Sequence, residues 1–110
     1  MSEFKIHVAG DYSATPLGRY RRQGEFSGQR FREDFLIPAL ENNEKIIVNF
    51  DGVAGLPSSF LEEAFGGLVR TGTISSVDFF KRVLIEVTNP ALELVRKRIR
   101  RYVENAKVRS

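Results

Sequence analysis

The 110-residue sequence contains no cysteine and no tryptophan, and it has only one histidine and one methionine. Without cysteine, the chain can form neither a disulfide nor a thiolate metal site. It also lacks any apolar run approaching the ~18 residues that a membrane-spanning helix needs. The first ten residues, MSEFKIHVAG, contain no long apolar stretch, so a secretory signal is not predicted. We therefore expect a cytoplasmic protein with no membrane attachment, no metal and no cofactor.

The residues that are present indicate a single small globular domain over residues 1–110. Hydrophobic residues make up 42% of the chain, and the net charge is +3. The charge is unevenly distributed. Residues 91–110 carry seven Lys or Arg and two acidic residues. Residues 1–90 carry ten Lys or Arg and twelve acidic residues. The positive excess therefore lies in the last segment.

Three segments have the pattern of β-strands. Phe4, Ile6 and Val8 alternate with polar residues, which is typical of a half-buried strand. The nearly continuous apolar run 46–50 predicts a central strand covered on both faces. A third strand is predicted near residues 81–88, after a polar connection over 70–76.

Three segments have the pattern of helices. The first covers about residues 28–42, starts at Ser27 or Gly28, and is predicted to kink or split at Pro38. The second starts near Ser59, which with Glu62 forms a predicted capping box. The third is a basic helix over 90–106, with Pro90 in its first turn.

Residues 10–27 form a long predicted loop with Pro16 and three glycines, and it could hold one short strand around Arg19–Arg22. Long loops in compact domains are often functional. Arg19, Arg21 and Arg22 lie together in this loop, beside Tyr20. They are open to two interpretations: a solvated surface, or a contact with an anion or a partner, because the guanidinium group matches phosphate and carboxylate.

The alternation of strands and helices predicts an α/β fold. Such an order favours parallel strands joined by right-handed crossovers. We expect a mixed or parallel sheet of three to five strands, flanked by about three helices.

One segment carries a resemblance to a known family. The run VNFDGVAGLPSSFLEEAFGGL resembles the core of STAS domains, the fold of bacterial anti-sigma factor antagonists. Together with FREDFLIPAL and the closing strand and helix, it is still more similar to a STAS-like family of undetermined function. The resemblance covers most of residues 28–106 and implies a single small STAS-like domain.

The resemblance implies a regulatory function. In anti-sigma factor antagonists, a kinase of the histidine-kinase ATPase fold phosphorylates a serine at a helix start, which switches partner binding. By position, Ser58 corresponds to that phosphoacceptor, with Ser59 beside it. Pro57 stands where these proteins carry aspartate, and Phe60 where they carry glycine. The candidate partner-binding loop comprises Asp51, Pro57, Ser58, Ser59 and Phe60. Glu62 and Glu63, in the first turn of the same helix, are expected to repel a phosphate there.

An enzymatic function is not predicted. Catalysis needs titratable groups, an activated nucleophile or metal ligands that converge in a cleft. Asp11, Asp51, Asp78 and His7 show no diagnostic spacing. Asp51 follows a strand, where α/β active sites often lie, but Asp-Gly is also an ordinary turn, which we favour. His7 points away from the apolar residues of its strand and is expected to be a surface residue.

The alternative function is nucleic-acid binding. The last helix carries five cations that could contact phosphates: Arg96, Lys97, Arg98, Arg100 and Arg101. Arg19, Arg21 and Arg22 could add to this surface. A solvated basic face or an acidic protein partner would explain the same charges. The oligomeric state is open, although Phe60, Phe79 and Phe80 would offer an apolar contact if they were exposed.

Overall fold

The computed structural model describes residues 2–107 and contains a sheet of three parallel strands. The strands are β1 (Glu3–His7), β2 (Lys45–Asn49) and β3 (Val83–Glu86), in the order β1-β2-β3. Phe4 lies beside Ile46, which lies beside Val83. The predicted α/β class and the three strands are confirmed, and the sheet is wholly parallel.

Two long helices of the structure each contain one wider, π-helical turn. The first joins α1 (Gly28–Phe31), the turn Arg32–Leu36 and α2 (Ile37–Asn42). The second joins α3 (Ser58–Leu61), the turn Glu62–Gly66 and α4 (Gly67–Arg70). The first wide turn ends two residues before Pro38, which has no N–H to donate. The helix continues through Pro38 to Asn42, so the predicted split at this residue does not occur. Ser27 caps this helix by accepting a hydrogen bond from the Arg30 N–H.

The other helices are α5 (Ser76–Arg82) and α6 (Val95–Asn105), together with shorter turns. The shorter turns are a π-helical turn at Val8–Tyr12 and 3₁₀ turns at Arg21–Gln23 and Pro90–Leu92. The basic helix therefore begins at Val95, after a 3₁₀ turn that starts at Pro90.

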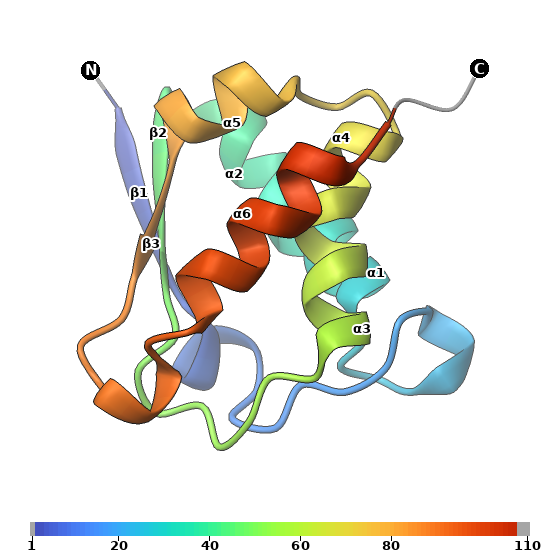
Figure 1. The fold of residues 1–110 in the computed structure, drawn as a ribbon, viewed down its shortest axis with the longest axis vertical. Coiled ribbons are helices and arrows are strands. Elements are labelled where there is room, and N and C mark those ends of the chain that lie inside the picture. Colours follow the sequence, from blue (N-terminus) through green and yellow to red (C-terminus); the bar gives the residue numbers. More distant parts are fainter. Residues whose placement is uncertain (1, 108–110) are drawn as a thin grey trace.

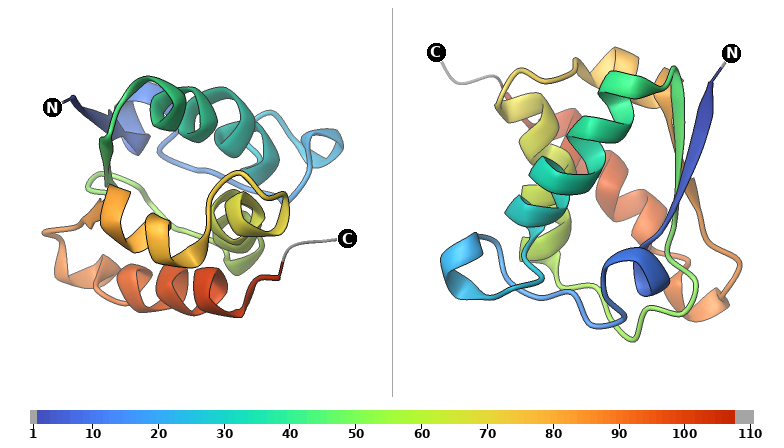
Figure 2. Two further views of the ribbon diagram at one scale, coloured as in Figure 1. Left: turned by 90° about the horizontal axis from the view of Figure 1, so that it is seen from above. Right: turned by 180° about the vertical axis from the view of Figure 1, so that it is seen from behind.

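The helices cover only one face of the sheet, as Figures 1 and 2 show. Ile6, Val48 and Ile85 point toward the helices and are buried. Leu84, which points the other way, is 58% exposed. The expectation that the strand over 46–50 is covered on both faces was therefore wrong, because Ile47 on its outer face is only partly buried. Five fully buried phenylalanines fill the core: Phe31, Phe50, Phe60, Phe65 and Phe79.

Two secondary-structure predictions were wrong. Residues 76–82 form α5, so the third strand covers only Val83–Glu86. Ser75 starts this helix by accepting a hydrogen bond from the Asp78 N–H, a cap that competes with extension of the strand. No strand forms at Arg19–Arg22 within the described residues, because Arg21–Gln23 make a 3₁₀ turn held by the Gln23 side chain.

Candidate functional site

The candidate site lies where the chain leaves the carboxyl end of β2 and enters α3. Ser58 is the first residue of α3, and its side chain is exposed. Pro57 precedes the helix and supplies no side-chain cap. The first N–H groups of a helix have no partner within the helix. The start of α3 therefore presents a hydroxyl group beside uncapped backbone donors.

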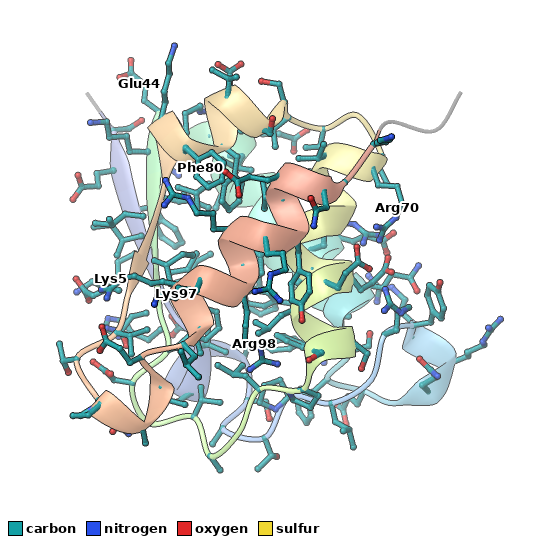
Figure 3. The ribbon with its side chains drawn as sticks, viewed as in Figure 1. Lys5, Glu44, Arg70, Phe80, Lys97 and Arg98 are labelled. Atoms are coloured by element: carbon teal, nitrogen blue, oxygen red, sulfur yellow. The ribbon has the colours of Figure 1, made fainter. Side chains whose placement is uncertain are left out.

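Helix α6 brings a cation to this hydroxyl. One Arg98 nitrogen donates to Ser58 Oγ at 2.9 Å and to the Leu56 carbonyl oxygen at 2.9 Å. Figure 3 shows Arg98 extending from α6 toward the start of α3. Interaction with the Ser58 hydroxyl lowers the pKa of the neighbouring Tyr102, although burial opposes the shift. Ser58, Arg98 and Tyr102 thus form one polar cluster between two helices.

The predicted capping box was wrong. The N-cap is Pro57, two residues before the expected Ser59, so Ser59 lies inside the helix, and no side chain caps its start. Glu62 does not turn back to the helix start, because it pairs with Arg19 and Arg70. Burial alone would raise the pKa of Glu62, but the hydrogen bonds and positive charges of Arg70 and Arg19 together outweigh it and lower this pKa.

Arginine side chains that pair with Glu62 and Glu63 offset the expected repulsion of a phosphate by these two carboxylates. Arg32 donates to a Glu63 carboxylate oxygen and to the Glu63 carbonyl oxygen, both at 2.6 Å. Arg70 binds Glu62 at 2.5 Å and Glu63 at 3.1 Å. Both carboxylates are therefore paired inside the molecule, and their charge does not stand free at the helix start.

Two other residues of the predicted partner-binding loop, Phe60 and Asp51, stabilise the fold itself. Phe60 is completely buried in the core, so its assignment to a partner-binding surface was wrong. It follows Ser58 by two residues and points inward, toward Phe31. Asp51 forms the expected turn with Gly52 and accepts hydrogen bonds from Thr88 and Asn89. Those bonds lower the pKa of Asp51 and join the ends of β2 and β3.

Most of the arginine loop is tied to the protein itself. Arg19 pairs with Glu62 and Glu63, and Arg21 pairs with Glu33 and Asp34. Arg22 lies over the Tyr20 ring, 5.1 Å from its centre. Nearby carboxylates therefore already occupy the guanidinium groups of Arg19 and Arg21, and a contact of these residues with an anion or a partner stays a prediction.

The cations of the basic helix also fall into two groups, those bound within the protein and those exposed to solvent. Arg96 donates to the carbonyl oxygens of Ile85 and Val87, and Arg98 is engaged at Ser58. Lys97, Arg100 and Arg101 are exposed. Of the three phenylalanines considered for an apolar contact, Phe60 and Phe79 are buried, and Phe80 is 43% exposed.

Residues 2–107 contain no group of three or more acidic or histidine side chains that could hold a metal ion. Over the same residues, no helix combines the length and the apolar character needed to cross a membrane.

The fold and the strand–loop–helix element around Ser58 are those of a STAS-like α/β domain. The sequence model of the STAS-like domain of unknown function (DUF4325) matches residues 27–91, which is more than half of the chain, and the protein belongs to this family. The match runs from the Ser27 cap into the 3₁₀ turn that follows β3, and it includes Ser58. Neither the comparison with curated proteins nor that with solved structures gave a match.

Sequence reasoning missed the grouping of Ser58 with Arg98 and Tyr102. Arg98 was assigned only to the basic surface of the last helix, and Tyr102 was given no part in the site. Both residues lie at least 40 positions from Ser58, and only the packing of α6 beside α3 brings them together. No local pattern in the sequence signals this contact.

Proposed function

We propose that this protein is a non-enzymatic regulatory module that binds a protein partner through the surface around Ser58. In this proposal, phosphorylation of Ser58 releases the partner, which is an ATPase or kinase of the histidine-kinase fold. Membership of the STAS-like family and the position of Ser58 at the start of α3 support the proposal.

The contact between Arg98 and Ser58 is the observation that carries it. A phosphoserine bears about −1.5 to −2 charges at neutral pH and pairs well with arginine. At Ser58 it would meet the Arg98 guanidinium, now 2.9 Å from the hydroxyl, and the uncapped N–H groups of the helix. These groups would stabilise the modified form. In the unmodified form, the exposed hydroxyl leaves the surface open to a partner.

Purification of tagged protein from its native cells tests the proposal. We expect an ATPase of the histidine-kinase fold to be recovered with wild type and Ser58→Ala, and to be lost with Ser58→Glu. Ser59→Glu is the matched control, because it adds the same charge one residue further on and should retain the partner. Recovery of the same proteins with all four forms would contradict the proposal.

Nucleic-acid binding is the second candidate, supported by the exposed cations Lys97, Arg100 and Arg101. Three phosphate contacts would give a salt dependence with a slope of about −2 to −3 in log affinity against log salt. Reversing these three charges would abolish such binding, while Ser58→Glu would leave it intact. The two candidates are therefore separable by the same set of variants.

A further inference from the structure

The two outer strands of the sheet expose their edges in different ways. At the β3 edge, Arg96 donates to the outward carbonyl oxygens of Ile85 and Val87. At the β1 edge, the described residues provide partners only for His7: its N–H donates to the Asp11 carboxylate at 2.8 Å, and its carbonyl oxygen begins the π-helical turn that follows. An unpaired strand edge is a template for pairing with another strand. The β3 edge is thus covered in part, whereas the β1 edge is open.

The backbone groups of Glu3 and Lys5 form this open edge. The Lys45 N–H donates to the Ser2 carbonyl oxygen, so Ser2 faces β2. In a parallel pair the facing residues alternate, and Phe4 and Ile6 therefore also face β2. Glu3 and Lys5 face outward, and no group among residues 2–107 hydrogen-bonds to their N–H or carbonyl groups.

We propose that the β1 edge pairs with β1 of a second copy of this chain, antiparallel and about a two-fold axis at Phe4. This pairing places Glu3 opposite the partner's Lys5 and joins two sheets into one of six strands. The proposal is independent of the function of Ser58, which lies on α3.

The charges of Glu3 and Lys5 favour this register over the two registers that are shifted by two residues. Opposite charges on facing residues stabilise an antiparallel pair, and like charges destabilise it. Glu3 opposite the partner's Lys5 gives two such pairs by symmetry and uses only free backbone groups. Each pair adds a second carboxylate to a Lys5 ammonium that already binds Glu86 of its own chain at 2.8 Å. A shift by two residues in one direction places Lys5 opposite the partner's Lys5 and needs the occupied His7 N–H. The opposite shift places Glu3 against the partner's Glu3.

Phe4 gives the same register an apolar contact. Its side chain is 49% exposed, which is unusual for a residue on the helix-covered face of the sheet. It borders a groove of about 320 Å³ between β1 and α2, lined in part by Phe35 and Pro38. Two Phe4 residues would meet across the axis, in the pair position where strand backbones approach most closely. The second copy would therefore cover a phenylalanine that a monomer leaves exposed.

The short strand makes this a weak association, so the test is a concentration series by sedimentation equilibrium. We expect a monomer–dimer equilibrium for wild type. Lys5→Glu and Glu3→Lys should each weaken association about tenfold, the equivalent of about 1.4 kcal/mol, because each places like charges opposite each other twice. The double variant Glu3→Lys/Lys5→Glu should restore association. Lys107→Glu, which changes the net charge equally beyond α6, should have no effect.

Amide hydrogen exchange locates the interface. The N–H groups of Glu3 and Lys5 should become protected as the protein concentration rises, while those of exposed loops should not. A protein that stays monomeric up to about 1 mM would overturn the proposal. So would a dimer that is insensitive to the two single variants, or one that the double variant fails to restore.

Discussion

Gly67, in the second long helix, packs closely against the Arg32 side chain of the first. A Cβ atom at this position would lie 2.2 Å from a guanidinium nitrogen of Arg32. Arg32 cannot swing away at low cost, because its side chain is only 6% exposed and is bound to Glu63. The absence of a side chain at Gly67 therefore allows the buried ion pair between the two long helices.

Gly67→Ala should lower the free energy of unfolding by about 1–3 kcal/mol, the range for disturbing a buried hydrogen-bonded group. Helix propensity alone predicts the opposite, a gain of about 1 kcal/mol. Urea denaturation measures the difference. Gly55→Ala is the control, because nothing lies within 4 Å of the added atom there. A stabilised Gly67→Ala protein would show that Arg32 moves freely.

Ionisation of Tyr12 is expected to lower the folding stability of the protein at alkaline pH. Its hydroxyl donates to the Ser27 carbonyl oxygen, and burial raises its pKa to about 12 from an ordinary value near 10. The folded state therefore holds this proton more tightly than the unfolded state does. The resulting stabilisation is complete below pH 10 and is lost as the pH rises from about 10 to about 12.

We expect the melting temperature of wild type to fall over this pH window more steeply than that of Tyr12→Phe. Absorbance titration of tyrosinate should show that Tyr12→Phe removes the ionisation at the highest pH. Equal pH slopes for the two proteins would contradict the raised pKa of the buried Tyr12. Tyr20→Phe, at a half-buried loop position, serves as the control.

At the scale of elements, the starts of two helices differ in how they are capped. Ser27 accepts a hydrogen bond from the Arg30 N–H, whereas no side chain caps α3. Loss of a serine cap typically costs about 1 kcal/mol. Ser27→Ala should therefore destabilise the protein by about this amount in urea denaturation, and Ser59→Ala should have a much smaller effect. A larger loss for Ser59→Ala would restore the predicted capping box.

The same two helices show what could be predicted from the sequence. Residues near a helix start define its cap when the competing partners are local, as at Ser27. At Ser59 and Glu62 the pattern was equally good, but Arg19 and Arg70 bind Glu62 from outside the turn. Long-range ion pairs therefore overrode a local motif. The short helix α5 was missed because its apolar residues run directly into those of β3.

At the scale of the whole molecule, packing of all helices on one face of the sheet organises the surfaces. It brings α6 beside α3, so that Arg98 reaches Ser58, and it leaves the outer face and the β1 edge uncovered. The family and the fold were predictable, because the strand–loop–helix pattern is local. The cluster at Ser58 was not, because it depends on where α6 lies.

Intact mass measurement of the protein isolated from its native cells is the most direct test of the proposed switch. We expect wild type to carry the mass of one phosphate in part of the population, and Ser58→Ala to carry none. Arg98→Gln should retain its fold and lower the phosphorylated fraction if the guanidinium stabilises the modified form. An unmodified wild-type protein, or a phosphate that persists in Ser58→Ala, would contradict the account.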